Sequence, residues 1–235
     1  DGGEQPVLTD DGGHTVRWLA RDVPSLGWKA YRLERRTDGA AQTWKPGLGN
    51  TIRNEHYELT VDPERGGGVR SLVETATGRE LIAPGRVGNE LALYDEYPAH
   101  PKAAEGPWHL LPKGPVYGAA GEPARVRVYR GPLGERIVVH GRLSAPSGEA
   151  GRPEEVLRYT QTLTLWHGVN RVDCRTTIDG FTGVDRLLRV HWPCPVPGAR
   201  PVSEVGDAVI GRPFALLHHP DGTVVDTAQH PWTLD

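Results

Sequence analysis

Short runs in which apolar and polar residues alternate, each closed by a turn, follow one another along this chain from Thr51 onward. The longest pair is VLRYTQTLTLWHGVNRVDCRTTI, in which HGVN turns the chain. Alternation brings four apolar residues of its first run to one side, namely Leu157, Tyr159, Leu163 and Leu165. Successive side chains of a strand point to opposite faces, so this pattern is typical of strands with one buried and one wet face.

Composition agrees with a chain built from strands. Thirty glycines and 21 prolines among 235 residues interrupt the chain too often for long helices. Strand joined to strand by short turns, with no helical period between, predicts antiparallel sheets packed as a sandwich. The glycine-rich ERGGGVRS stretch joins two of these strands instead of opening a helix, so it lacks the amide-lined helix start that binds phosphate. We therefore predict an all-β fold, a large antiparallel β-sandwich.

Two regions are expected along the chain. Residues 1–50 hold HTVRWLARDVPSLGWKAYRLERR, which alternates like a strand at both ends around Pro24 and Gly27, and the linker-like TDGAAQTWKPGLGN. Residues 51–235 then form the sandwich, with residues 1–50 as a small β segment plus linker. The sequence contains no methionine. We therefore expect a piece processed or excised from a longer protein.

Charge and hydropathy exclude some partners. A formal net charge of -3 gives no basic surface for nucleic acid and no polybasic signal for anionic lipid. The longest apolar runs are far shorter than the roughly 20 residues that span a bilayer. We expect no nucleic-acid or membrane partner, and a neutral or weakly polar ligand. Scarce lysine beside abundant arginine, alanine, glycine and proline indicates a GC-rich bacterial genome.

The cysteines, Cys174 and Cys194, are too few for a disulfide framework. Both lie in strand-like segments that could be hairpin partners, so a bridge between them is conceivable. We expect buried free thiols instead, because a free cysteine behaves as a small apolar residue. Free thiols favour a cytoplasmic location for the protein.

Two adjacent carboxylates, Asp95 and Glu96, end the apolar run GNELALYDE. Glycoside hydrolysis uses two carboxyl groups about 5 to 9.5 Å apart across the scissile bond. Neighbours on a strand point to opposite faces, however, so these two are not expected to act as a catalytic pair. We predict either that one of them accepts a hydrogen bond from a ligand hydroxyl, or that both are exposed carboxylates that cap neighbouring amides or meet arginines.

A tryptophan and a histidine follow in GPWHLLPKGP, where Trp108 is flanked by Pro107 and His109. An indole on a stiff loop offers a flat apolar surface to a sugar ring, although a tryptophan of the core is the alternative. Trp108 and His109, with Asp95 and Glu96, are therefore the candidate substrate-binding residues.

The HHPDG segment near the end of the chain contains His219 and Asp221 at a spacing that can hold zinc. The same residues make a plain proline-led turn, with Asp and Gly where turns favour them. Two ligands without a third are a weak signal, so a turn is expected. We predict no metal ligand and no catalytic residue in this chain.

Several blocks, in order, resemble the β-rich C-terminal region of glycoside hydrolase family 38 α-mannosidases. They are IRNEHYELTVDPERGGGVRSLVETATGRELI, GNELALYDEYP, LTLWHGVNRVDCRTTIDG and RLLRVHWPCPV. DVPSLGWKAYRLE is similar to the small β segment that precedes that region. The resemblance implies a galactose-mutarotase-like supersandwich. It also implies an upstream catalytic domain, with zinc held by His and Asp ligands and an aspartate nucleophile, followed by a helical bundle.

By this resemblance, the parent enzyme hydrolyses terminal α-mannosidic linkages with retention. The present chain is then its noncatalytic C-terminal part, with the catalytic and helical domains of the same chain as partners and zinc in the catalytic domain. Trp108 is similar in position to an aromatic residue that reaches the substrate pocket in some members, where Tyr is followed by an aliphatic residue. Three alternatives remain: an independent carbohydrate-binding module, a structural oligomerisation domain, and a mutarotase-type epimerase. The epimerase ranks last, because it needs a convergent His and Glu and no spacing in the sequence indicates such a pair.

Overall fold

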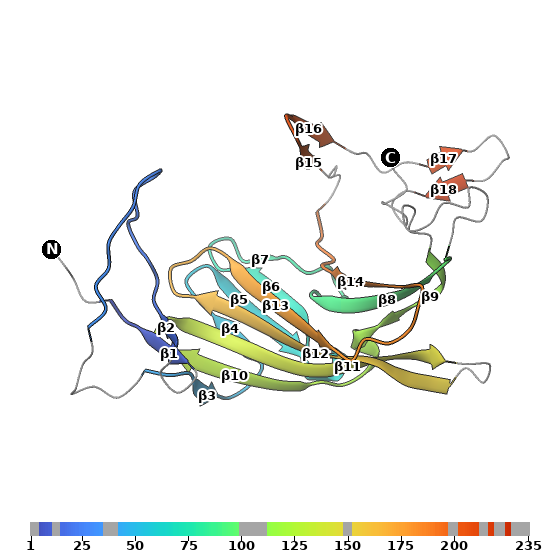
Figure 1. The fold of residues 1–235 in the computed structure, drawn as a ribbon, viewed down its shortest axis with the longest axis horizontal. Coiled ribbons are helices and arrows are strands. Elements are labelled where there is room, and N and C mark those ends of the chain that lie inside the picture. Colours follow the sequence, from blue (N-terminus) through green and yellow to red (C-terminus); the bar gives the residue numbers. More distant parts are fainter. Residues whose placement is uncertain are drawn as a thin grey trace.

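A computed structural model describes residues 5–10, 15–34, 42–98, 112–147, 152–196, 202–211, 216–218 and 224–226. Its regular elements are β-strands and two single-turn 3-10 helices, η2 (Pro63–Arg65) and η3 (Ala119–Gly121). The strands form two packed layers (Figure 1), which confirms the all-β sandwich. No helix among the described residues is long and apolar enough to cross a bilayer. Trp108, His109, His219 and Asp221 lie outside the described residues.

One layer is a five-stranded antiparallel sheet in the order β13-β12-β11-β10-β3. Its strands are β3 (Lys45–Gly47), β10 (Arg125–Gly131), β11 (Gly134–Ser147), β12 (Arg152–Trp166) and β13 (Val172–Asp179). The predicted HGVN turn joins β12 to β13, and Leu163 pairs with Cys174 across them. Because β3 precedes residue 51, this sheet takes its edge strand from the region expected to be a linker. The division of the chain near residue 50 remains a prediction.

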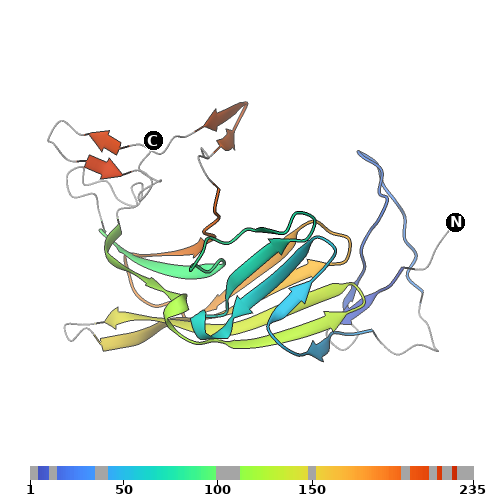
Figure 2. The ribbon, with the colours of Figure 1, turned by 180° about the vertical axis from the view of Figure 1, so that it is seen from behind.

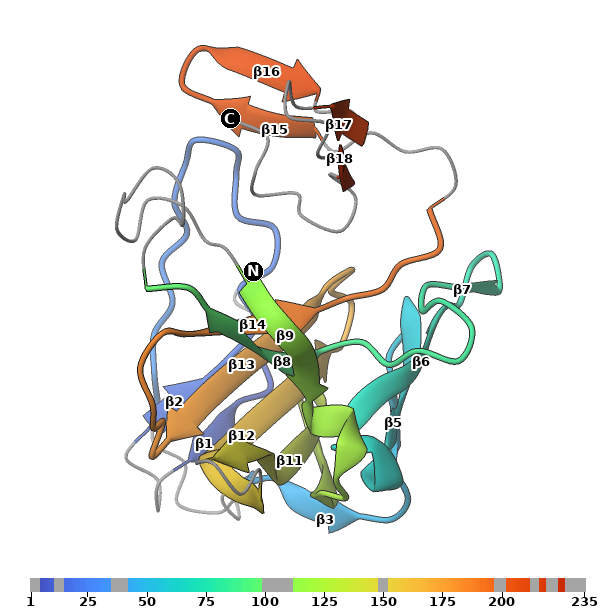
Figure 3. The same ribbon diagram turned by 90° about the vertical axis from the view of Figure 1, so that its right-hand side faces the viewer.

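The second layer consists of two smaller sheets side by side over the first (Figures 2 and 3). One has the order β4-β5-β6-β7 and the other the order β14-β8-β9. Their strands are β4 (Thr51–Arg53), β5 (Tyr57–Asp62), β6 (Gly68–Glu74), β7 (Arg79–Glu80), β8 (Glu90–Glu96), β9 (Pro112–Gly118) and β14 (Arg186–His191). Val69 and Gly88 exchange two backbone hydrogen bonds of 2.8 Å and so join the two sheets into one layer.

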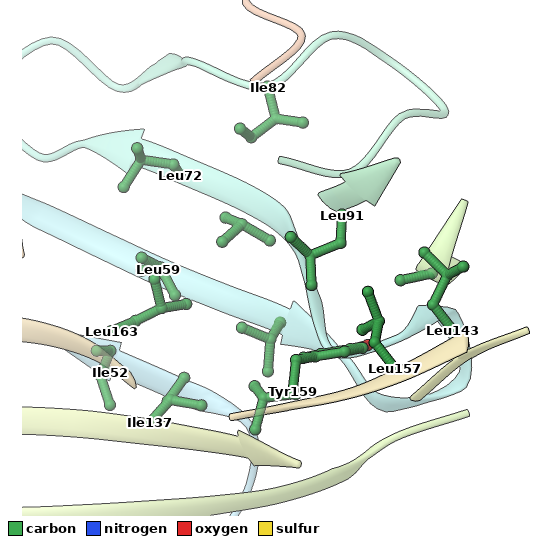
Figure 4. Packing of buried hydrophobic residues seen from close by; sticks show 14 of the residues in the cluster. Ile52, Leu59, Leu72, Ile82, Leu91, Ile137, Leu143, Leu157, Tyr159 and Leu163 are labelled. Carbon is green, nitrogen blue, oxygen red and sulfur yellow. The ribbon is translucent and has the colours of Figure 1, made fainter. Parts of the chain in front are cut away.

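The core lies between the layers and follows the alternation seen in the sequence. The four apolar residues predicted to share one side of β12 are all buried, at 2 % exposure or less. One end of this surface is covered by the four-stranded sheet, through Ile52, Leu59 and Leu72. At the other end, Leu91 of the three-stranded sheet lies near Leu143 and Leu157 (Figure 4). Both small sheets are therefore fixed against the same large sheet.

The glycine-rich stretch turns the chain between β5 and β6, as predicted. Gly66 and Gly67 have φ angles of 64° and 66°, in the left-handed region that glycine adopts without strain. A Cβ on Gly67 would lie 2.3 Å from Cγ1 of Val139. The carbonyl of Gly66 accepts a 2.8 Å hydrogen bond from the hydroxyl of Tyr159. This turn thus packs directly on the large sheet, where no side chain fits.

Three short hairpins flank the sandwich. They pair β1 (Leu8–Asp10) with β2 (Thr15–Arg17), β15 (Val202–Val205) with β16 (Ala208–Gly211), and β17 (Leu216–His218) with β18 (Val224–Asp226). The first is tied to the body, because Leu8 is fully buried and the Thr9 amide donates to the carbonyl of Gln42 at 2.8 Å.

Cys174 and Cys194 are free, as expected, but both are exposed. The prediction of buried thiols is therefore wrong. Cys174 lies opposite the buried Leu163, but its strand β13 is the edge of the five-stranded sheet, where the covering layer is incomplete. Cys194 follows the end of β14, outside any strand. Alternation indicated the correct face of β13 without indicating how far the opposite layer extends.

Candidate functional site

The three-stranded sheet carries a polar surface on the side that faces away from the core. Along β8, Leu91 and Leu93 point inward and are buried, so alternation turns Glu90, Tyr94 and Glu96 outward. Cross-strand pairing brings two residues of β14 to the same side, since Arg189 pairs with Ala92 and His191 with Glu90. We call these five residues, Glu90, Tyr94, Glu96, Arg189 and His191, the polar face.

Tyr94 and His191 are the central contact of the polar face. The Tyr94 hydroxyl lies 2.9 Å from Nε2 of His191, with ring centroids 5.9 Å apart, and the Arg189 guanidinium lies 5.8 Å from the centre of the Tyr94 ring. Burial raises the pKa of Tyr94 and lowers the pKa of His191. At neutral pH the pair therefore consists of a protonated phenol and a neutral imidazole, which can donate and accept hydrogen bonds.

Glu90 is held at the base of this surface by the turn after β9. Its Oε1 accepts a 3.3 Å hydrogen bond from the amide of Ala120 in η3. A Cβ on Gly118 would lie 2.3 Å from the same oxygen, so the backbone of β9 approaches the carboxylate closely. The Glu90 carboxylate is therefore fixed against the end of β9.

Asp95 and Glu96 point to opposite faces of the sheet, as alternation predicts. Oδ1 of Asp95 lies 3.2 Å from Nε of Arg186, its cross-strand partner, on the side of the core residues. The carboxylate of Asp95 thus meets an arginine, which was one of the two predicted outcomes. The two carboxyl groups therefore point away from each other, and that they do not act together as the acid and base of a glycosidase stays a prediction.

Glu96 has an unusual environment. Its Oε1 is buried and has no hydrogen-bond partner among the residues that the structure describes. Burial raises the pKa of the Glu96 carboxyl, and the nearby Asp185 carboxylate adds to this effect while Arg189 opposes it. A buried polar atom without a partner costs free energy. Oε1 of Glu96 is therefore a buried acceptor of the polar face that no described residue satisfies.

The connection that contains Trp108 and His109 begins and ends beside Glu96, because Glu96 pairs with Pro112 at the start of β9. The fold thus brings both ends of this connection to the polar face, although the two residues themselves lie outside the described part of the chain. Whether they contact a ligand remains a prediction.

A cleft of about 660 Å³ opens between β9 with η3 and the ends of β11 and β12. Its lining includes Tyr117, Glu122, Arg142, Ser144 and Glu155. Nε of Arg142 lies 2.6 Å from a carboxylate oxygen of Glu122. Burial acts to raise the pKa of Glu122, but hydrogen bonds from Ser144 and Arg142 outweigh it and lower that pKa. The sequence did not predict this cleft, because its lining residues come together only through strand pairing.

The described residues bring together no group of three or more His, Cys, Asp or Glu side chains that could hold a metal ion. The zinc implied by the family resemblance therefore has no matching donor set among these residues. His219 and Asp221 lie outside the described residues, so the prediction of a turn there remains a prediction.

Comparison with known proteins identifies a family and two mammalian relatives. The model of the glycosyl hydrolases family 38 C-terminal domain matches residues 52–223, from β4 to the residue before β18. Alpha-mannosidase 2C1 of Homo sapiens is 40 % identical over 99 residues, which cover 42 % of this chain and 8 % of the human protein. Alpha-mannosidase 2C1 of Mus musculus is 39 % identical over the same length. The aligned stretch thus spans less than a tenth of either relative.

Proposed function

This chain belongs to the glycosyl hydrolase family 38 C-terminal domain family, and from that premise we propose that it is the noncatalytic C-terminal β domain of an α-mannosidase-like glycoside hydrolase. The observation that carries the proposal is the extent of the match, which includes strands of both layers of the sandwich. The catalytic and helical domains of the same parent chain are its partners, and zinc belongs to the catalytic domain.

The geometry of the adjacent carboxylates supports a noncatalytic role. A retaining glycosidase needs two carboxyl groups about 5 to 5.5 Å apart on either side of the scissile bond. Asp95 is paired with Arg186, and Glu96 lies on the other face of the sheet. In this proposal the nucleophile and the acid are supplied by the catalytic domain, and the present chain stabilises that domain.

The polar face is the surface through which the domain would contribute to carbohydrate binding. Sugar hydroxyls donate and accept hydrogen bonds, and the polar face offers a phenol, an imidazole, a guanidinium and the carboxylate of Glu96. Trp108 in the adjoining connection would pack against the apolar face of the sugar ring, with His109 beside it. The buried Oε1 of Glu96 is suited to accept a hydrogen bond from a substrate hydroxyl.

Hydrolysis of an aryl α-mannoside in the presence of zinc tests the noncatalytic role. The purified 235-residue chain and the full-length parent enzyme are compared at equal concentration. We expect turnover by the full-length enzyme and none by the chain alone. Turnover by the chain that persists through repurification would contradict the noncatalytic role, and an inactive full-length protein would contradict the assignment to an α-mannosidase.

Substrate contact is tested with Trp108→Ala and Glu96→Gln in the full-length enzyme. We expect KM to rise with little change in kcat, because these residues would bind ground state and transition state alike. Arg127→Ala, at an exposed position of β10, is the matched control. Calorimetry on the isolated chain distinguishes a supporting domain from an independent carbohydrate-binding module. Measurable mannoside binding that Trp108→Ala abolishes would identify such a module.

One observation favours a second function, aldose epimerisation. His191 and Glu90 are a cross-strand pair, and such an enzyme needs a His and a Glu that converge on one sugar. Both groups already have partners, Tyr94 for the imidazole and Ala120 for the carboxylate, which ranks this function below the carbohydrate-binding module. Exchange between the anomers of free mannose, followed by NMR, decides it: a rate above buffer that His191→Gln removes would establish epimerisation.

A further inference from the structure

Residues 18–34, which we call the arm, leave the sandwich after β2 and project beyond it (Figures 1 and 2). The arm exposes large apolar side chains along its whole length. They are Trp18, Val23, Leu26, Trp28, Tyr31 and Leu33, with Leu26 fully exposed, Trp28 82 % exposed and Leu33 69 % exposed. A soluble monomer rarely exposes a contiguous apolar surface above a few hundred Å², whereas burial of each aromatic side chain removes about 150–250 Å² from water.

The arm is held in a defined position. At its base, Nη2 of Arg21 donates a 3.0 Å hydrogen bond to the carbonyl of His167, in the turn between β12 and β13. Its two limbs are joined by side chains: the rings of Trp18 and Tyr31 lie 5.8 Å apart, and Nζ of Lys29 donates to the carbonyl of Arg21 at 2.9 Å. The exposed apolar residues are therefore presented in a fixed arrangement.

The backbone of the arm lacks the hydrogen bonds of a sheet. Among the described residues, the one backbone–backbone hydrogen bond within residues 18–34 runs from the amide of Gly27 to the carbonyl of Pro24, at 3.1 Å. This bond closes the turn at the tip. Within the described part of the chain, the two limbs on either side form no ladder with each other or with the sandwich. Such unpaired backbone groups provide a template for another strand.

Leu26, at the tip, has a φ of 54°. This is the left-handed region that glycine and asparagine favour and that costs free energy for leucine. Contacts within the isolated chain do not offset this cost, because the Leu26 side chain is fully exposed. Residues held in such conformations are concentrated at functional positions.

We infer that the arm is a docking site for an extended strand from another domain of the same parent enzyme. The partner must supply backbone groups, because most backbone amides and carbonyls of the arm form no hydrogen bond with the described residues. It must also supply apolar side chains, because Leu26 and Trp28, and again Tyr31 and Leu33, are exposed two residues apart. This inference rests on the proposed function for the identity of the parent chain.

Charge and length support this occupant. The cations of the arm already have partners within the chain: Arg32 pairs with Glu34 at 3.2 Å, Lys29 and Arg21 donate to carbonyls, and Lys29 lies over the Tyr31 ring. A polyanion such as nucleic acid or an anionic membrane is therefore a poor fit. The mammalian relatives extend far beyond the matched stretch, which is 8 % of their length, so related proteins contain chain that can supply the strand.

Hydrogen–deuterium exchange of the backbone amides tests the inference. We expect the amides of residues 28–34 to exchange freely in the 235-residue chain and about 100-fold more slowly in the full-length enzyme, as ladder hydrogen bonds require. Equal rates in both proteins would overturn it. A dimer of the isolated chain with protected arms would overturn it as well, because the occupant would then be a second copy.

Two variants of the full-length enzyme extend the test. Trp28→Ser removes an exposed side chain of the arm, and we expect it to restore fast exchange in residues 28–34 while the amides of β12 stay protected. Val184→Ser, at a position 86 % exposed between β13 and β14, is the control and should leave the arm protected. A full-length enzyme that hydrolyses mannosides with an unprotected arm would refute this inference alone. A protected arm in an inactive enzyme would refute the proposed function alone.

Discussion

The hydroxyl of Tyr94 lies 2.9 Å from Nε2 of His191, on the outer side of β8 and β14. This contact joins two strands that are about one hundred residues apart in the chain, and the Arg189 guanidinium lies close to the same tyrosine ring. The polar face is therefore an interacting set of side chains, fixed by strand pairing, and we expect the titration of His191 and Glu96 to change the stability of the fold.

Stability should fall on acidification because of His191. Burial lowers its pKa below the ordinary value of 6.5, with Glu90 opposing and Arg189 adding to the effect. The unfolded chain then binds more protons below about pH 6.5 than the native chain does. The contribution of His191 to the free energy of unfolding is therefore present above pH 6.5. It is lost as the pH falls through the lowered pKa of the native state. Urea titrations from pH 7.5 to pH 5 should show this loss in the wild type and a flatter profile for His191→Gln. If the stability of His191→Gln depended on pH as that of the wild type does, the role of His191 would be contradicted.

Glu96 should have the opposite dependence on pH. Its pKa is raised above the ordinary 4.5, so the native chain binds more protons than the unfolded chain does just above pH 4.5. The stabilising contribution is present below that pH and is lost as the pH rises through the raised native pKa. Glu96→Gln should therefore stabilise the protein at pH 7 more than at pH 4. Asp95→Asn, on the other face, is the control and should not reproduce this pattern.

The ion pair of Asp95 with Arg186 should contribute a measurable coupling energy. The Arg186 side chain is 15 % exposed and that of Asp95 is 30 % exposed, so solvent screens the pair only in part. A double-mutant cycle with Asp95→Asn and Arg186→Gln should give a coupling of about 1 kcal/mol in the free energy of unfolding. Strictly additive effects would show that the pair contributes nothing.

Gly67→Ala should destabilise the fold through two effects. Its φ of 66° costs a non-glycine residue about 1–2 kcal/mol, and the new methyl group would overlap Val139, at a further cost of about 1–3 kcal/mol. Gly78→Ala is the matched control, because Gly78 also has a positive φ but nothing lies within 4 Å of its Cβ position. Urea unfolding should show the larger loss for Gly67→Ala. Equal losses would mean that the contact with Val139 is relieved without cost.

Strand identity and inward-facing residues could be predicted from the sequence because both follow from local alternation. Leu157, Tyr159 and Leu163 are buried on one side of β12, and Asp95 and Glu96 point to opposite faces, as their spacing requires. The ion pair of Asp95 is also of the predicted kind.

The composition of the polar face could not be predicted, because it depends on which strand lies beside β8. His191 is adjacent to Glu90 through pairing of β14 with β8, and nothing local in either segment specifies that partner. The exposure of Cys174 was missed for a similar reason, since it depends on the extent of the opposite layer. The exposure of Trp28 could not be predicted either, because the segment that we infer to cover it lies outside this chain.

Complementation between separated parts tests most directly whether this domain supports a catalytic domain. The parent enzyme is prepared without the residues that correspond to 52–235, loaded with zinc, and assayed on an aryl α-mannoside with and without the purified 235-residue chain. We expect activity and thermal stability to fall on deletion and to recover in part when the chain is added. A truncated enzyme with full activity and unchanged thermal stability would contradict the proposed role of this domain.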